Sequence, residues 1–316
     1  MTDEAPHCLV VSDGRRGIEN QALGLAEHCA ALRPLQIQTH HISHGKMLAA
    51  MPPKAQLKLA KFDLPECEIA IGCGRQAIAP LLHLKRSRPK VMTVYIQDPR
   101  MDPSAFDLVI APEHDSVRGP NVVTIIGAPN RITEAKLSDA TRDFAEELSK
   151  YSNPRAALLI GGASKTHELD LPSHEAHIDA ALGLRAAGHS LLITTSRRTP
   201  DYAKSAWARF ASRDDQIWTH DGGAPNPYFA FLGGADLILV TEDSTNMLTE
   251  ACATGKPVCR LPMAGKAGKF QQLYDALEKG CGVVGYTGQQ AGQAYAPLQE
   301  SVRAAQSVWE TYDSRA

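Results

Sequence analysis

The stretch DLILVTEDSTNMLTEACATGKPV, which spans residues 236–258, decides the fold class of this chain. The apolar run at 236–240 predicts a buried strand, and the small polar residues after it predict a loop that enters a helix. Gly255 predicts the end of that helix, and Pro257 precedes the next strand. A strand, a short helix and a second strand in this order are typical of an α/β fold with a parallel sheet.

The same alternation of apolar runs and helical patterns continues along the whole chain. The apolar runs do not alternate strictly with polar residues, which is typical of parallel strands covered by helices on both faces. A turn signal at Asn153-Pro154 marks the middle of the chain. We therefore predict an α/β protein with two Rossmann-like domains, over residues 1–152 and 153–297, that face each other across a cleft. A helix over residues 298–316 is expected to return to the N-terminal domain.

Length, charge and composition exclude several classes of protein. The chain has 316 residues, and its net charge of −2 gives no general basic field for nucleic acid. No apolar run reaches the roughly 20 residues that cross a membrane, and the acidic N-terminus is typical of neither a signal peptide nor a transit peptide. The seven cysteines are scattered without a CxxC motif, which favours reduced thiols. We expect a soluble, cytoplasmic protein with no nucleic-acid partner and no transmembrane segment, and peripheral membrane contact stays open.

The polar residues after the 236–240 strand have the chemistry of a nucleotide site. Ser244, Thr245 and Asn246 open the predicted helix, and backbone amides at a helix N-terminus can hold a diphosphate. Glu250 lies in the following turns, where a carboxylate can accept hydrogen bonds from two ribose hydroxyls. The alternative is a capped surface helix with a solvated glutamate.

A glycine pair follows the first strand of the C-terminal half. Gly161 and Gly162 permit close approach to the backbone, while Ser164 and Lys165 offer hydrogen-bond donors suited to phosphate. The glycine spacing is not that of a Walker loop. We expect this loop to contact a phosphate, with an ordinary tight turn as the alternative.

Two loops at strand ends carry arginine pairs. Arg15 and Arg16 follow the first strand of the chain, and Arg197 and Arg198 follow the second strand of the C-terminal half. Guanidinium groups bind phosphate and carboxylate through charge-assisted hydrogen bonds. We expect these arginines to contact an anion, with solvated turns as the alternative.

The N-terminal loop also holds the candidate for acid–base chemistry. Gly14 and Gly17 predict a loop that wraps closely around a ligand, on the acceptor side of the site. Asp13 is a candidate general base, although a strand-end aspartate is more often a helix cap. His114, at the end of a later strand, is expected on the same acceptor side.

No metal site is predicted. His174 and His177 share one face of a predicted helix, but no carboxylate spacing completes a recognised set of metal ligands. We therefore expect these two histidines on the surface of the helix.

Taken together, these segments resemble the mitochondrial fission Elm (elongated mitochondria) family. The resemblance rests on SDGRRGIENQ at 12–21, PEHD at 112–115, GPN at 119–121, GGASKTHELD at 161–170, TSRRTP at 195–200 and TEDSTNMLTEACATGKP at 241–257. The order of Glu250, Gly255 and Pro257 also resembles the donor-binding segment of GT-B glycosyltransferases, in particular the peptidoglycan N-acetylglucosamine transferase family.

These resemblances imply a GT-B architecture and a nucleotide-sugar-dependent glycosyltransferase. A nucleotide-diphosphate sugar would bind the C-terminal domain as donor with no obligatory cofactor, because helix ends and basic side chains can neutralise the leaving diphosphate. The acceptor is unknown, and a lipid-linked or surface glycan fits. The alternative is a non-catalytic adaptor that binds a protein partner. The residues argue against a short-chain NAD-dependent epimerase, since none of the eight tyrosines has a lysine four residues later.

Overall fold

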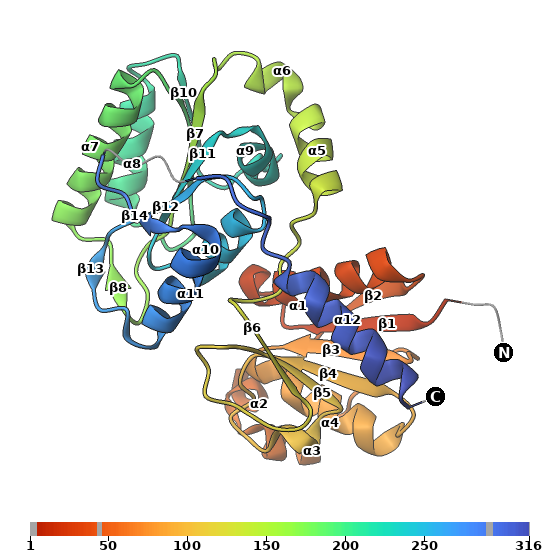
Figure 1. Cartoon of the computed structure of the whole chain (residues 1–316). Helices are drawn as coiled ribbons and strands as arrows, with labels where there is room; N and C mark the ends of the chain where they lie inside the picture. The colour runs from red at the N-terminus through yellow and green to blue at the C-terminus, as the bar shows by residue number, and fades with distance from the viewer. Residues whose placement is uncertain (1–4, 43–45, 289–292, 316) are drawn as a thin grey trace. The chain divides into compact units, whose positions relative to one another are not determined.

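The chain forms two compact units, shown in Figure 1. The structure is a computed structural model that describes residues 5–42, 46–288 and 293–315. Unit 1 contains Met1–Arg131 and Gln299–Ala316, and unit 2 contains Ile132–Leu298. The predicted α/β class is confirmed, because each unit is built on a parallel sheet of six strands.

Unit 1 has the strand order β2-β1-β3-β4-β5-β6. The strands are β1 (His7–Ser12), β2 (Gln36–His41), β3 (Ile69–Cys73), β4 (Met92–Ile96), β5 (Leu108–Pro112) and β6 (Val122–Ile125). In the register of the sheet, Cys8 on β1 pairs with Ile37 on β2 and with Ile69 on β3. The chain leaves β1 toward β2 and then returns to β3 on the other side of β1. The strand order therefore reverses between β1 and β3.

Helices cover both faces of the unit 1 sheet. They are α1 (Arg16–Leu32), α2 (Lys46–Ala50), α3 (Pro53–Leu59), α4 (Arg75–Ser87) and α12 (Glu300–Asp313), with a short 3-10 helix at Pro103–Ala105. Cys8 and Val10 point to the face that α1 and α12 cover, and Leu9 and Val11 point to the face that α4 covers. Both sets are almost completely buried, as expected for a strand inside a parallel sheet.

The C-terminal helix α12 completes one of these faces. It lies beside α1 in Figure 1, and its buried residues Ala304, Ala305, Val308 and Trp309 belong to the same apolar cluster as β1. The indole N–H of Trp309 donates to the carbonyl oxygen of Cys29 on α1 at 3.0 Å. The end of the chain is therefore part of the core of unit 1.

Unit 2 repeats the architecture with the strand order β10-β9-β7-β11-β12-β14. The strands are β7 (Arg155–Ile160), β9 (Ser190–Thr195), β10 (Ile217–His220), β11 (Leu237–Thr241), β12 (Val258–Leu261) and β14 (Val284–Gly285), and β8 (His167–Glu168) pairs with β13 (Ala264–Gly265) in a separate antiparallel ribbon. The chain adds β9 and β10 on one side of β7 before it places β11 on the other. The strand order therefore reverses between β7 and β11.

The helices of unit 2 are α5 (Glu134–Asp143), α6 (Ala145–Leu148), α7 (Leu171–Ala186), α8 (Asp201–Ala211), α9 (Tyr228–Gly234), α10 (Thr245–Cys252) and α11 (Gln271–Cys281), with a 3-10 helix at Gly268–Phe270. Asp170 caps α7 by accepting a hydrogen bond from the backbone N–H of Ser173 at 2.9 Å. In the core of this unit, Trp207 on α8 is buried in one cluster with Leu158 on β7 and Leu239 on β11.

The chain divides at residues 131 and 132, and not at the predicted boundary near 152. The reason is the packing of α5 against α9 in unit 2. A Cβ atom at Gly233 on α9 would lie 2.4 Å from the hydroxyl oxygen of Thr141 on α5, so the missing side chain lets the two helices approach closely. The polar helical stretch before Asn153 consequently belongs to the second unit.

Removing the indole of Trp309 should destabilise unit 1. Trp309→Ala leaves a cavity in the core and removes one of the two hydrogen bonds that the Cys29 carbonyl accepts, which together should lower the free energy of unfolding by about 3–5 kcal/mol. The matched control is Glu310→Ala on the exposed side of the same helix, which should change it by less than about 0.5 kcal/mol. Differential scanning calorimetry measures both. Equal unfolding profiles for the two variants would contradict the placement of α12 in the core.

Candidate functional site

The reversal of strand order in unit 2 brings the predicted glycine pair next to the loop after β11. The backbone N–H of Gly161 donates to the hydroxyl oxygen of Thr241 at 2.7 Å, and the N–H of Gly162 donates to Oδ2 of Asp243 at 3.1 Å. The Thr241 hydroxyl in turn donates to Oδ1 of Asp243 at 2.7 Å. Ligands of open α/β sheets bind outside the carboxyl ends of the strands at such a reversal, so this is the candidate site of unit 2.

The glycine pair itself has a different role from the predicted one. Both amides already donate to the side chains of Thr241 and Asp243, so contact of this loop with a phosphate stays a prediction for its other residues. A Cβ atom at Gly161 would lie 2.0 Å from Oδ1 of Asp243, and one at Gly162 would lie 2.0 Å from the carbonyl oxygen of Arg198. The glycines are needed because protein atoms, rather than a ligand, approach the backbone here.

Arg198 is the basic side chain that this arrangement fixes. Its Nη2 lies 2.6 Å from Oδ2 of Asp243, and its Nη1 donates to the carbonyl oxygen of Ala163 at 3.0 Å. The Asp243 side chain is completely buried, while 44% of the Arg198 side chain is exposed. The guanidinium is thus anchored from inside the protein and presents its outer edge to solvent, where it can meet an anion.

The other predicted donor-side residues lie in the same loops. Lys165 and Arg197 are exposed, one in the loop after β7 and the other in the loop after β9. The Ser164 hydroxyl accepts the backbone N–H groups of Thr166 at 3.2 Å and His167 at 3.0 Å, so it stabilises a turn. Because β9 and β7 are neighbours in the sheet, both cationic side chains start from the same edge.

Helix α10 begins directly after the predicted polar loop. Ser244 is its N-cap, and the Ser244 hydroxyl oxygen accepts from the backbone N–H of Met247 at 3.4 Å. Thr245 and Asn246 form the first turn and are partly buried. The positive end of the α10 dipole therefore lies at the carboxyl edge of the sheet, where it stabilises negative charge.

Glu250 has a partner that the sequence analysis missed. The phenol of Tyr228, at the start of α9, donates to Oε2 of Glu250 at 2.6 Å. Glu250 is partly buried, so the structure does not support the alternative of a surface helix with a solvated glutamate. Burial raises the pKa of the Glu250 carboxyl to about 7, and the hydrogen bond from Tyr228 opposes this shift. The turn signal Asn226-Pro227 marks the start of α9, but no local pattern connects it to Glu250.

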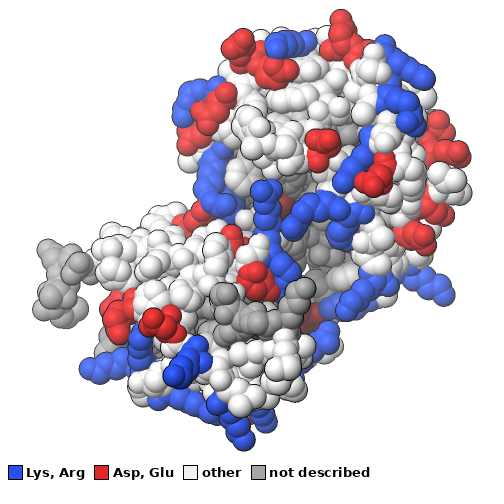
Figure 2. All heavy atoms as spheres, turned by 180° about the vertical axis from the view of Figure 1, so that it is seen from behind, with Lys and Arg blue, Asp and Glu red and all other residues white. Residues whose placement is uncertain are grey.

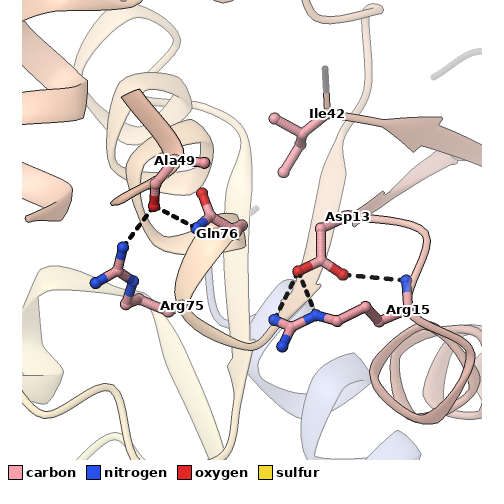
Figure 3. A pocket seen from close by; sticks show the side chains of 6 residues that line it. All are labelled: Asp13, Arg15, Ile42, Ala49, Arg75 and Gln76. Carbon is pink, nitrogen blue, oxygen red and sulfur yellow. Dashed lines mark hydrogen bonds and ion pairs between the residues drawn. The ribbon is translucent and has the colours of Figure 1, made fainter. Parts of the chain in front are cut away.

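A pocket of about 510 Å³ lies in unit 1 at the carboxyl ends of β1 and β3. It is lined by Asp13, Arg15, Ile42, Ala49, Arg75 and Gln76, which Figure 3 shows from close by. The Arg15 guanidinium holds the Asp13 carboxylate, with Nε at 2.8 Å and Nη2 at 2.7 Å from Oδ2. Asp13, the predicted general base, is therefore already engaged by a cation.

The remaining predicted residues of unit 1 surround this pocket or lie further along the sheet. Gly14 is exposed with a φ of 77°, and its N–H donates to the Ser12 hydroxyl at 3.0 Å. Arg16 and Gly17 open α1 and are exposed. His114 follows β5, which β4 separates from β3, and it is not among the residues that line the pocket.

Comparison with known proteins identifies the family. The model of the family described as "Mitochondrial fission ELM1" matches residues 16–312. The chain belongs to the mitochondrial fission ELM1 family. The "Mitochondrial fission protein ELM1" of Arabidopsis thaliana is 27% identical over 267 residues, which are 76% of this chain and 62% of that protein. The chain thus spans less than two thirds of the length of this ELM1 relative.

Solved structures resemble this ELM1-family chain in fold. A putative UDP-N-acetylglucosamine 2-epimerase from Listeria monocytogenes has a TM-score of 0.60 and 12% identity, with 98% of this chain and 96% of that chain covered. The UDP-GlcNAc 2-epimerase of Neisseria meningitidis, bound to UDP-GlcNAc, has a TM-score of 0.56 and 12% identity, with 98% and 100% covered. This likeness shows the fold, which is the GT-B type with two Rossmann-like domains.

The histidines and cysteines of this ELM1-family chain are buried or lack the grouping that a metal site needs, within the residues that the structure describes. His174 and His177 are buried, not on a helix surface as expected, and the His177 ring lies against the carbonyl oxygen of Pro262 at 2.7 Å. Within residues 5–42, 46–288 and 293–315, no group of three or more His, Cys, Asp or Glu side chains could hold a metal ion. None of the seven cysteines, all of which are described and buried, forms a disulfide bond.

Figure 2 shows basic and acidic side chains interspersed on one face of the molecule, in keeping with the net charge of −2. None of the described helices has the length and apolar character that a membrane span requires.

Adding one methyl group at Gly161 should disrupt the candidate site of unit 2. In Gly161→Ala, the new Cβ displaces the Asp243 carboxylate from its hydrogen bonds, and such overpacking should lower the free energy of unfolding by about 1–3 kcal/mol. The matched control is Gly183→Ala on α7. A Cβ atom at Gly183 would have no described neighbour within 4 Å, so this substitution should raise the free energy of unfolding by about 0.5–1 kcal/mol. Urea unfolding followed by tryptophan fluorescence, to which Trp207 and Trp218 of unit 2 contribute beside Trp309 of unit 1, measures both. Stabilisation by both substitutions would show that Asp243 does not need this glycine.

Proposed function

We propose that unit 2 binds a nucleoside-diphosphate sugar at the β7/β11 reversal and that the protein transfers the sugar to an acceptor held on unit 1. The observation that carries this proposal is the anchored guanidinium of Arg198 beside the N-terminus of α10. A guanidinium and a helix N-terminus both stabilise a diphosphate. Lys165 and Arg197 start from the same sheet edge and can add positive charge, which would neutralise the leaving diphosphate without a metal.

The second support is the distance from the cap of α10 to Glu250. Glu250 lies six positions after Ser244, which corresponds to about 9 Å along the helix axis. A nucleotide whose diphosphate lies at the helix start would therefore place its ribose near Glu250. Tyr228 occupies one hydrogen-bonding position of this carboxylate, and a carboxylate has about four in total. The other positions can accept ribose hydroxyls.

The alternative function is a non-catalytic adaptor that keeps the GT-B fold and binds a protein partner. The name of the Arabidopsis relative, a mitochondrial fission protein, favours this alternative. The anchored Arg198 and the spacing from Ser244 to Glu250 favour the enzyme, because an adaptor has no use for either feature. The cytoplasmic location, the unidentified acceptor glycan and the facing of the two units across a cleft stay predictions.

Calorimetric titration with a panel of nucleotide sugars tests the proposal. UDP-, GDP- and ADP-sugars carry a diphosphate and should include the ligand, whereas a CMP-sugar carries one phosphate and should bind more weakly. UDP-GlcNAc is the first probe, because a structure with this fold is bound to it. NMR spectra of the same mixtures distinguish transfer, hydrolysis and epimerisation of the sugar. Absence of binding across the whole panel would overturn the proposal in favour of the adaptor.

Neutralising Arg198 should weaken the binding of the nucleotide sugar. Arg198→Gln removes a charge-assisted contact with the diphosphate, which should cost about 1.5–3 kcal/mol, or roughly 10- to 150-fold in affinity. The control is Arg209→Gln, which removes the same charge from an exposed position on α8 of the same unit. Calorimetry with the ligand found in the panel measures both variants. Equal loss in both would indicate a general charge effect and no contact at Arg198.

The affinity for the nucleotide sugar should also depend on pH through Glu250. Because burial raises the pKa of this carboxyl to about 7, the group is largely protonated below that pH and is then a poorer acceptor for ribose hydroxyls. Affinity should therefore rise up to about tenfold from about pH 6 to about pH 8. Glu250→Gln should abolish this dependence. A nucleotide sugar is the correct probe, because its diphosphate has no free terminal phosphate that titrates in this range. The same pH dependence in Glu250→Gln would assign it to another group.

A further inference from the structure

The pocket of unit 1 lies where its strand order reverses. Asp13 and Arg15 follow β1, while Arg75 and Gln76 follow β3, and these two strands are neighbours on either side of the reversal. Crevices at this position are the usual ligand sites of doubly wound sheets. A volume of about 510 Å³ is within the range of pockets that hold small molecules. All of its lining residues belong to unit 1, whereas the residues of the proposed nucleotide site belong to unit 2.

Two arginines are fixed on opposite sides of this pocket. Figure 3 shows Arg75, Ala49 and Gln76 on one side and Asp13 and Arg15 on the other. The Nη2 of Arg75 donates to the carbonyl oxygen of Ala49 at 2.5 Å, and Arg15 is held by Asp13. Each guanidinium has five N–H donors, so both keep donors for a ligand after these contacts. With the single carboxylate of Asp13, the lining carries one net positive charge.

Two helix N-termini add to this positive potential. Arg15 is the N-cap of α1 and Gly74 is the N-cap of α4, and neither residue makes a capping hydrogen bond with its own side chain. A Cβ atom at Gly74 would lie 2.9 Å from Cδ1 of Ile18 on α1, so the two helix starts are in close contact. Helix N-termini stabilise anions, and here they accompany two anchored arginines in a formed pocket.

The remaining lining suits a hydroxylated ring. The Asp13 carboxylate and the Gln76 amide can exchange hydrogen bonds with hydroxyl groups, and Ile42 offers an apolar surface for the C–H face of a sugar. We propose that this pocket binds a sugar ring that carries one anionic group, either a carboxylate or a phosphate. The assignment of this sugar as the acceptor rests on the proposed glycosyltransferase function, whereas its binding does not.

NMR titration of the full chain with three simple probes tests this inference. Glucuronate carries a carboxylate, glucose 6-phosphate carries a phosphate, and glucose is neutral. At least one anionic sugar should bind about tenfold or more tightly than glucose, because charge-assisted hydrogen bonds are the stronger kind. A preference for glucuronate would indicate a sugar acid, and a preference for glucose 6-phosphate would indicate a sugar phosphate. Equal affinity for all three probes would overturn the inference.

Variants on the two sides of the pocket locate the binding. Arg75→Gln and Arg15→Gln should each remove most of the preference for the anionic sugar. Arg86→Gln is the matched control, since it removes the same charge from an exposed position on the same helix as Arg75. Because Arg75 also holds the backbone of α2, circular dichroism and the thermal unfolding of each variant check that the protein is folded. Unchanged preference in both pocket variants, or equal loss in the control, would overturn the inference.

Nucleotide binding and anionic-sugar binding are measured separately, so the two proposals can fail independently. A chain that binds glucuronate but no nucleotide sugar would keep the unit 1 pocket and lose the proposed glycosyltransferase. A chain that binds a nucleotide sugar but shows no preference for an anionic sugar would keep the donor site and lose this inference.

Discussion

The buried carboxylate of Asp243 joins the ends of three neighbouring strands in unit 2. It accepts from the amide of Gly162 after β7 and from the hydroxyl of Thr241 at the end of β11, and it pairs with Arg198 after β9. A buried charge is costly unless every lone pair has a partner, so these loops must take up this arrangement together. The position of Arg198, and with it the proposed diphosphate site, depends on this one carboxylate.

Each unit contains an aspartate–arginine ion pair next to the reversal of its strand order. In each, an aspartate after a sheet strand next to the reversal of strand order anchors an arginine: Asp13 holds Arg15 in unit 1, and Asp243 holds Arg198 in unit 2. The difference is burial, because the Asp13 side chain is 14% exposed and that of Asp243 is not exposed at all. The guanidinium of unit 1 is therefore held at the rim of an open pocket, and that of unit 2 is held by the protein interior.

Unit 2 contains a second carboxylate, Glu250, which accepts a hydrogen bond from the phenol of Tyr228. Asp243 contacts the guanidinium of Arg198 and the amide of Gly162, whereas Glu250 contacts the neutral phenol of Tyr228. The pKa of Glu250 is consequently raised by burial with little to oppose it. Asp243 thus joins three loops of the protein, whereas Glu250 keeps acceptor positions beyond the one that Tyr228 fills.

The sequence by itself determined the α/β class, the parallel sheets, the helix after Ser244 and the loops that hold the site residues. These follow from local signals, because apolar runs, caps, glycines and prolines act on neighbouring residues. Only the tertiary structure decided which groups form hydrogen bonds with each other. Gly162 and Asp243, which are bonded, lie 81 residues apart in the chain, and Tyr228 and Glu250 lie 22 residues apart. The division at 131, the burial of His174 and the pairing of Arg15 with Arg75 around one pocket also depend on how elements pack. Such contacts join residues that are distant in the chain, and no local pattern of residue types specifies which distant partner will be brought close.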